Sequence, residues 1–208
     1  MRKFVFLAAV FAAAGLAQFP ASVAQEKKDE KKDEKKEPEI IVPYVPTNDK
    51  VVAAMLTLAA VKEGETVYDL GCGDGRIVIA AVKDFKAKRG LGIDFNPERL
   101  KDCTASVKKA KLTGDQEKAL TFKEGDVLKM TPEDFKGVDV VTMYLLPEVN
   151  LKLRPILEKG LKPGARIVSH DFDMGDWKED KKVELKYTSD SGLDRSSNVY
   201  LWTIKEKK

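Results

Sequence analysis

The sequence predicts an α/β fold, in which helices cover both faces of a mostly parallel sheet. From residue 47 onward, apolar runs of strand length alternate with amphipathic runs of helix length. A glycine cluster at residues 71–75 follows the first strand-like run, as at a turn that approaches a ligand. The last two strand-like runs are joined by a turn at 189–197, too short for a helical crossover, so we expect an antiparallel pair at one edge.

Capping residues and prolines mark where the predicted helices begin. Thr47 or Asn48 can cap the first helix. Asn96 caps the third helix and Pro97 occupies its first turn, a position that suits both residues. Pro147 opens the fourth. The helices are predicted over 47–61, 76–85, 96–112 (ending near Gly114) and 147–161.

The predicted strands are short, and the run at 139–145 (DVVTMYL) is the most apolar of them. In the last strand two sets of side chains alternate, which predicts a strand with one covered face. One set is Val199, Leu201 and Thr203, and the other is Tyr200, Trp202 and Ile204. The strands are predicted over 66–70, 90–94, 120–123, 139–145, 166–170, 183–188 and 198–204.

Residues 1–24 have the pattern of an export signal. Arg2 and Lys3 precede an apolar run that is shorter than the ~20 apolar residues needed to span a bilayer. Ser22 and Ala24 supply small residues for cleavage before Gln25. We therefore expect export to the periplasm or the cell exterior. The alternative is an uncleaved anchor through residues 4–19, which would keep the protein near a membrane.

Residues 25–39 form a charged tract without apolar side chains, so we expect a disordered linker there and a folded domain over 40–208. The chain carries a net charge of +3, to which the signal contributes +2 and the tract −1. A domain so close to neutral argues against nucleic acid as a partner. One histidine and two cysteines exclude a Cys/His zinc cluster, and we predict no metal site.

The stretch DLGCGDGR at 69–76 is the most informative in the chain. A dinucleotide loop would need G-x-G-x-x-G, but here the third glycine comes one residue early. No Gly-Lys-Ser/Thr follows, which excludes a phosphate-binding P-loop. The alternative to a ligand-binding loop is a tight strand-to-helix turn.

Carboxylates stand at three neighbouring strand ends, namely Asp69, Asp94 and Asp126. Asp94 follows the glycine loop by about twenty residues, where a carboxylate can accept both hydroxyls of a ribose. Asp126 can line an adenine pocket. Because so many negative charges would repel a phosphate, the pattern predicts a nucleoside ligand without phosphates.

The series VYDLGCGDG, GID and GDV resembles the motifs of class I S-adenosylmethionine (SAM) methyltransferases over about residues 44–205. The resemblance implies a Rossmann-like seven-stranded sheet of order 3-2-1-4-5-7-6 with strand seven antiparallel. It also implies SAM as the cofactor. By this resemblance, Asp69 and the three glycines of the loop would hold the methionine part of SAM, and Asp94 would hold its ribose. Asp126 and Val127 would line the adenine. The cofactor residues so implied are Asp69, Gly71, Gly73, Gly75, Asp94, Asp126 and Val127.

A narrower resemblance links residues 43–47 (PYVPT), DLGCGDGRIVIAA and LPE at 146–148 to protein-lysine methyltransferases of the mitochondrial ATP synthase c-subunit and adenine nucleotide translocase type. In that group the segment before the domain folds over SAM, which makes Tyr44 and Thr47 candidate cofactor contacts. This chain departs from the group in having Asp94 instead of Glu, and HDFD at 170–173 instead of apolar and aromatic residues. The implied activity is methyl transfer to a protein lysine; a small-molecule acceptor and a non-catalytic binding module are the alternatives.

Methyl transfer is an in-line displacement, so the enzyme gains most by positioning the reactants. A lysine nucleophile must first lose its proton, and three residues near strand ends are candidates for catalysis. Tyr144 is either a channel residue or an ordinary aromatic, and Glu148 either a catalytic acid or a first-turn acid favoured by the helix dipole. His170 is either a base or a structural histidine.

The two cysteines lie on different elements. Cys72 belongs to the glycine loop and Cys103 to the helix at 96–112. A disulfide requires Cα atoms within about 7 Å, and these elements are expected to hold the two residues further apart. The sequence therefore predicts two free thiols.

Overall fold

The computed structural model describes residues 44–189 and 191–206. The predicted export signal and the predicted linker at 25–39 lie outside these residues and remain predictions. Within the described part, no helix is both long and apolar enough to cross a membrane.

The sheet has seven strands in the order β3-β2-β1-β4-β5-β7-β6, which confirms the predicted topology. Strands β1 to β5 run parallel, and β7 is antiparallel to both β5 and β6. The order reverses beside β1, so the loops after β1 and β4 diverge and leave room for a ligand between them. The strands are β1 (Thr66–Leu70), β2 (Arg89–Asp94), β3 (Leu120–Glu124), β4 (Val140–Met143), β5 (Arg166–His170), β6 (Lys181–Thr188) and β7 (Asp194–Thr203).

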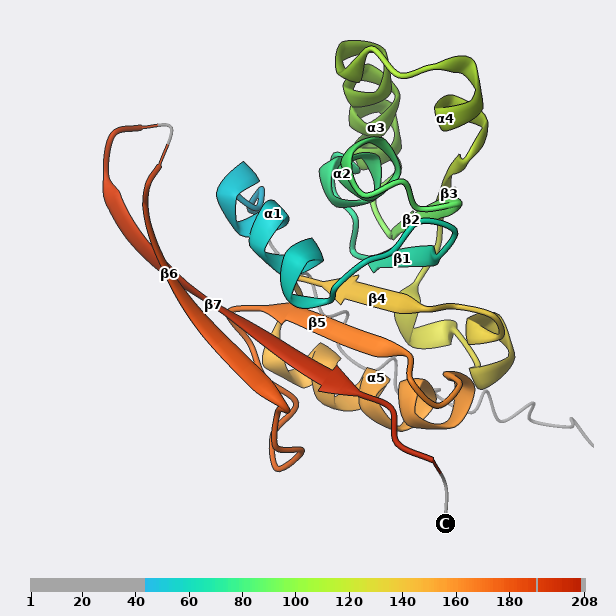
Figure 1. Ribbon diagram of the computed structural model, residues 1–208, viewed down its shortest axis with the longest axis vertical. Helices are drawn as coiled ribbons and strands as arrows, with labels where there is room; N and C mark the ends of the chain where they lie inside the picture. Colours follow the sequence, from blue (N-terminus) through green and yellow to red (C-terminus); the bar gives the residue numbers. More distant parts are fainter. Residues whose placement is uncertain (1–43, 190, 207–208) are drawn as a thin grey trace, which may run out of the picture. The chain divides into compact units, whose positions relative to one another are not determined.

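Helices cover both faces, as predicted: α1, α2 and α3 lie on one face and α5 on the other (Figure 1). Short 3-10 helices take the place of a longer helix between β3 and β4. The bounds are α1 (Asp49–Leu58), α2 (Arg76–Asp84), α3 (Pro97–Ala110), α4 (Gly114–Lys118), α5 (Pro147–Gly160), η1 (Val127–Lys129) and η2 (Pro132–Phe135).

Helix α4 was not predicted, and α3 ends before the expected stop near Gly114. Lys111 adopts a left-handed conformation (φ 53°) that ends α3 directly after Ala110. Thr113 and Gln116 then cap α4 reciprocally, each side chain bonding the other residue's backbone N–H. This capping box supplies the start signal for a second, shorter helix.

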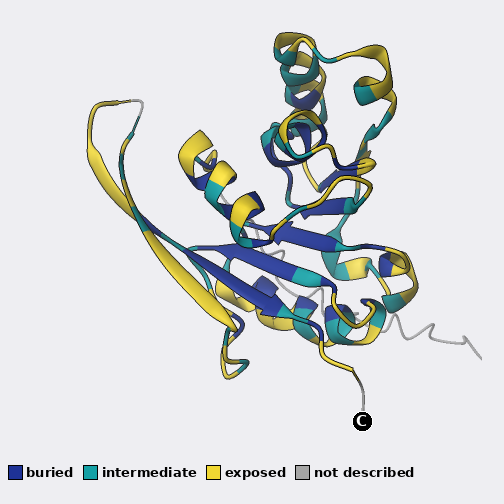
Figure 2. Cartoon of the chain, in the orientation of Figure 1, coloured by how far each residue is buried: buried dark blue, intermediate teal, exposed yellow. Residues whose placement is uncertain are grey.

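Two apolar clusters fill the spaces on either side of the sheet. Figure 2 shows the central strands buried and the outer hairpin exposed. The prediction that the last strand has one covered face is wrong, because Val199 and Leu201 pack into the cluster with α1 while Tyr200 and Trp202 pack into the cluster with α5. Trp202 is fully buried. Both faces of β7 are covered over residues 199–202 because the two clusters lie on opposite sides of the sheet, whereas residues 194–196 are exposed.

The β6–β7 hairpin extends past the end of β5. Pairing between β5 and β7 ends at His170 and Val199, whereas β6 and β7 remain paired out to Thr188 and Asp194. The projecting half of the hairpin, residues 184–188 and 194–198, therefore stands beside the carboxyl ends of the parallel strands (Figure 1).

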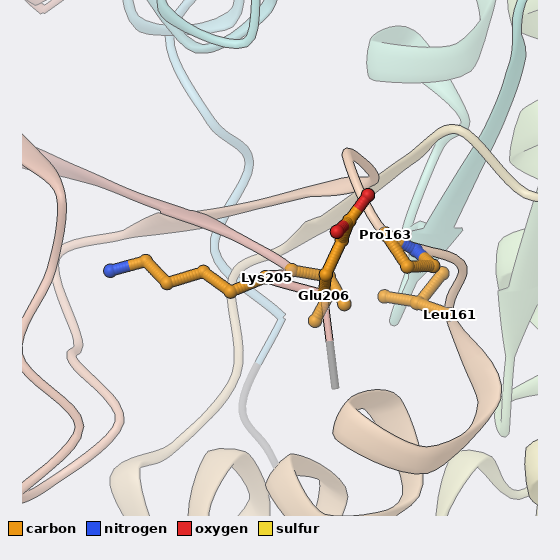
Figure 3. Close-up of a pocket in the computed structure, with 5 residues that line it drawn as sticks. Leu161, Pro163, Lys205 and Glu206 are labelled. Atoms are coloured by element: carbon orange, nitrogen blue, oxygen red, sulfur yellow. The ribbon is translucent and has the colours of Figure 1, made fainter. Parts of the chain in front are cut away.

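A hollow at the opposite end of the sheet is not a suitable ligand site. Leu161, Pro163 and Ile204 line it together with the two residues that follow Ile204. In Figure 3 the side chain of Lys205 points away from Leu161 and Pro163. The hollow lies at the end of the sheet where β5 begins, whereas ligands of parallel sheets bind at the end where the strands finish.

Candidate cofactor and acceptor site

The glycine loop after β1 is bound tightly to the end of β2. The backbone N–H groups of Gly71 and Cys72 both donate to the carbonyl of Ile93, at 2.8 and 2.9 Å. Gly73 has φ +55°, and a Cβ there would lie 2.4 Å from Cε2 of Tyr44. Only glycine fits such a conformation and such a close approach without strain. At Gly73 the loop therefore presents its backbone, without a side chain, to the residues that pack against it.

Asp94 closes the loop from the end of β2. One carboxylate oxygen accepts the N–H of Gly73 at 2.8 Å, and the other accepts the N–H of Asn96 at 2.9 Å. The side chain is half-buried, so each oxygen retains lone pairs for a further donor. Phe95 follows directly and is 60% exposed, a candidate that no sequence pattern marked.

Asp69 is a buried carboxyl group beside this loop. It is 1% exposed, and Thr142 donates to its Oδ1 at 2.7 Å. Burial raises its pKa to about 7, and the nearby charges of Asp94 and Asp74 act in the same direction. A buried acid poised to ionise near neutral pH is typical of a site that receives a cation.

The segment before α1 contacts the loop through Tyr44 and Thr47, whose predicted contact with the cofactor stays a prediction. The Tyr44 ring lies over Gly73 and under the guanidinium of Arg99, which is 4.3 Å from the ring centroid. Arg76 donates to the carbonyl of Thr47 at 2.7 Å. The structure thus brings this segment and the glycine loop together.

Asp126 and Val127 lie at the start of η1, next to the end of β3. Asp126 accepts the N–H of Leu128 at 2.9 Å and so caps the 3-10 helix. It borders an open hollow of about 440 Å³ together with Ile93, Gly125 and Met130. Val127 packs against the cluster under α5.

An aromatic group forms the mouth beyond β4 and β5. The Tyr144 ring lies 3.9 Å from the His170 ring and 6.1 Å from the Phe172 ring, nearly parallel to the latter at 19°. Burial raises the pKa of Tyr144, and the charge of Asp171 acts in the same direction. The phenol is therefore a hydrogen-bonding group at neutral pH rather than a base.

His170 is held rather than free. It is 3% exposed, with Nδ1 3.3 Å from Thr47 Oγ1 and Nε2 3.0 Å from Ser197 Oγ. Burial lowers its pKa, although the charge of Asp171 opposes this. A neutral, buried imidazole with both nitrogens in hydrogen bonds joins the N-terminal segment to β7.

Asp171 is a mouth residue that the sequence marked only through the HDFD stretch at 170–173, without a catalytic role. Its φ of +60° is rare for a residue other than glycine, although aspartate and asparagine tolerate it. Two bonds to Asn198 hold it there: its N–H donates to the Asn198 carbonyl at 2.7 Å, and its Oδ1 accepts the Asn198 N–H at 2.8 Å. Its Oδ2 lies 3.3 Å from His170 Nε2. The HDFD departure was the signal that marked it.

Asn150 supports the same mouth from α5. It is fully buried, and its Nδ2 donates to Ser169 Oγ and to the carbonyls of Phe172 and Asp173, at 3.2 to 3.3 Å. These bonds fix the loop that carries Phe172 and Asp171. Glu148, at the start of α5, is exposed in the first turn of the helix, where an acid is favoured by the dipole.

The two cysteines are free thiols, as predicted, but they are also neighbours, which the sequence did not indicate. Cys72 Sγ and Cys103 Sγ lie 4.0 Å apart, and both side chains are free and buried. Helix α3 packs its one buried residue, Cys103, directly under the glycine loop. Among the residues that the structure describes, no group of three or more His, Cys, Asp or Glu side chains is arranged to hold a metal.

The sheet order and the glycine loop together define a class I SAM-dependent methyltransferase. The residues fit this cofactor, because Asp69 offers a buried carboxyl to a cation and Asp94 offers lone pairs to hydroxyl donors beside the glycine loop. The chain belongs to the family described by the ANTKMT methyltransferase domain, which matches residues 69–181.

Two curated relatives carry names of the same kind. A protein-lysine N-methyltransferase of Saccharolobus islandicus is 42% identical over 80% of this chain and 96% of its own length. The human lysine N-methyltransferase of the ATP synthase c-subunit is 28% identical over 68% of this chain, which spans 57% of that protein.

A solved structure carries a different acceptor in its description. It is an RNA methyltransferase from Salinibacter ruber in complex with S-adenosyl-L-homocysteine. It is 45% identical to this chain, with a TM-score of 0.67 over 79% of this chain and 96% of its own.

Proposed function

We propose that this SAM-dependent methyltransferase methylates the side-chain amine of a protein lysine. The observation that carries the proposal is the mouth beyond β4 and β5, where the Tyr144 and Phe172 rings stand beside the carboxylate of Asp171. Aromatic faces and a carboxylate are the groups that attract an ammonium ion. The names of the two curated relatives support the same acceptor.

On the cofactor side, we assign the methionine ammonium to Asp69 and the methionine backbone to the loop of Gly71, Gly73 and Gly75. Asp94 would accept the ribose hydroxyls, since its oxygens already face the loop. Asp126, Val127 and the exposed ring of Phe95 would border the adenine, with Tyr44 and Thr47 covering the cofactor. When bound, SAM supplies an electrophilic methyl group on its sulfonium.

On the acceptor side, each residue has a separate task. Tyr144 and Phe172 flank the lysine side chain, and Asp171 Oδ2 accepts a hydrogen bond from its ammonium and then receives its proton. His170 acts as a positioning residue, because its hydrogen bonds to Thr47 and Ser197 hold the ring against Tyr144. Glu148 is exposed at the rim of the mouth, so it would contact a part of the substrate that lies outside the mouth.

RNA is the second candidate acceptor, favoured by the description of the Salinibacter relative. The near-neutral charge of residues 40–208 disfavours it, because binding to a phosphate backbone draws on an excess of Lys and Arg. The two acceptors can be distinguished by enzymatic digestion, because protease degrades a protein acceptor and ribonuclease degrades an RNA acceptor.

Transfer of radiolabelled methyl groups from SAM to fractionated lysate and membranes of the source cell separates these acceptors. We expect label in material that protease removes and ribonuclease leaves, with methyllysine after acid hydrolysis. Label that ribonuclease removes would establish the RNA acceptor and overturn the lysine proposal. A chain that binds no SAM at high micromolar concentration would overturn both.

Asp171→Asn is expected to lower kcat/KM for the lysine acceptor by about thirtyfold, since a hydrogen bond to a charged group contributes about 1.5–3 kcal/mol. Asparagine tolerates the left-handed backbone and keeps an acceptor for Asn198, so the fold and the Kd for SAM should persist.

Asp173→Asn is the matched control, because Asp173 is exposed two positions further on and its side chain bonds only its own loop at Gly175 among the described residues. Its kcat/KM should stay near the parent value. Equal losses in the two variants, or a loss of SAM binding in Asp171→Asn, would refute the role of Asp171 in acceptor binding.

A further inference from the structure

The two cysteines of the chain form a buried thiol pair under the glycine loop. Their sulfur atoms lie 4.0 Å apart, although 31 residues separate them in the sequence. Cys72 is 5% exposed and Cys103 fully buried. The Cys103 thiol donates to the carbonyl of Gly73 at 3.2 Å. This pair is therefore part of the support on which the loop rests.

The surroundings of the pair are tight. A Cβ on Gly92 of β2 would lie 2.8 Å from Cys72 Sγ, and a Cβ on Gly75 would lie 3.1 Å from Cys103 Sγ. The glycines at both places leave the room in which the thiols meet. The hydrogen bond with Cys103, together with burial, raises the pKa of the Cys72 thiol.

We propose that Cys72 and Cys103 form an intramolecular disulfide that changes the cofactor loop and weakens SAM binding. The oxidant is a small-molecule disulfide. Cys72, the less deeply buried of the two, attacks it, forms a mixed disulfide and releases one small thiol that carries the Cys72 proton. Cys103 then attacks the Cys72 sulfur, and the second small thiol leaves with the Cys103 proton. Two protein thiols are oxidised and one small disulfide is reduced.

Closure of the bond changes the loop for a geometric reason. A disulfide requires a separation of about 2.05 Å, so the sulfurs must approach each other by about 2 Å. The residues of α3 are held in a helix, whereas Cys72 lies between two glycines with left-handed backbone, so the loop moves. Gly73 then loses the thiol that bonds its carbonyl and is drawn from its position against Asp94.

The inference rests on the proposed role of the loop in holding SAM, and the two are separable. Cofactor binding by the reduced chain tests the role of the loop, while intact mass tests the bond. Because the chain has two cysteines, a monomer lighter by two hydrogens contains this disulfide and no other.

The experiment treats the full chain with excess oxidised glutathione and measures intact mass, free thiols and SAM affinity by calorimetry. We expect the internal disulfide to form, the Kd for SAM to rise by roughly tenfold or more, and dithiothreitol to restore both. Saturating SAM should slow the oxidation. If the disulfide weakens SAM binding, then bound SAM must disfavour the disulfide by the same factor.

Cys103→Ser keeps a donor for the Gly73 carbonyl and cannot form the internal bond, so oxidation should stop at the mixed disulfide of Cys72 with glutathione, which intact mass identifies. Cys103→Ala provides a second variant should the serine disturb the packing. A reduced chain that binds SAM but forms no internal disulfide overturns the proposal. So does an internal disulfide that leaves the Kd unchanged, or a Cys103→Ser chain that loses affinity on oxidation while its mass shows no adduct.

Discussion

Asp69→Asn is expected to stabilise the unliganded protein at pH 8 while it weakens the binding of SAM. The buried carboxyl has a pKa of about 7 in the folded chain, against 3.8 for an ordinary aspartate, mainly because burial disfavours its charge. Asparagine has the shape of the protonated acid and still accepts the hydrogen bond from Thr142. It therefore removes the cost of burying a charge without removing that contact.

The pH dependence of the effect follows from proton linkage. Below about pH 4 the carboxyl is protonated in both states, and the two proteins should be equally stable. Between about pH 4 and 7 the unfolded chain releases the proton and the folded chain keeps it, so wild-type stability falls by about 1.4 kcal/mol per pH unit. Above pH 7 the fall ends, at a total of at most about 4 kcal/mol.

Urea unfolding at pH 4, 6 and 8 measures this difference, and calorimetry measures the loss of SAM affinity. Asp139→Asn is a suitable contrast: burial opposes the charge there too, but bonds to Lys162 and to the N–H of Thr66 outweigh it and lower the pKa. That variant should be less stable than wild type at pH 8. An Asp69→Asn protein whose stability falls with pH as steeply as wild type would contradict the buried-charge account.

Asp94→Ala is expected to raise the Kd for SAM by roughly 150-fold or more, because two hydrogen bonds to a charged acceptor at about 1.5–3 kcal/mol each are lost. In the unliganded chain the same carboxylate holds Gly73 and Asn96, so the variant also loosens the loop. Asp94→Asn separates the two effects, since the amide oxygen still accepts one bond.

Calorimetric titration with SAM gives the affinities, and thermal unfolding without SAM gives the contribution of the loop. Asp115→Ala, in the exposed helix α4, is the matched control for a lost carboxylate. An unchanged Kd in Asp94→Ala would remove the ribose role, and an equal loss in Asp115→Ala would point to net charge instead.

Much of the fold follows from local patterns. The strand ends at Leu70, Asp94 and His170 were predictable because each closes an apolar run and precedes a turn or a cap. The covering of both faces of β7 was not, because alternation reports which side chains point together and says nothing of which elements lie on each side.

The mouth and the thiol pair illustrate the same limit. Cys103 meets Cys72 because α3 packs its buried side under the loop, a rotation that sequence spacing does not define. Asn150 and Asp171 act through backbone groups of other segments, namely the carbonyls of Phe172 and Asp173 and the N–H of Asn198. Backbone groups are common to all residues, so the sequence does not show which of them a side chain will contact, and only the folded structure does.

The bond between Thr47 and His170 spans 123 residues, and Ser197 completes it from β7. Contacts this distant in sequence form late, because loop closure must precede them. The glycine loop and Asp94, by contrast, are 21 residues apart and can form early. During synthesis the cofactor half of the site is thus complete in sequence long before the acceptor half, and the mouth closes only after β7 has left the ribosome.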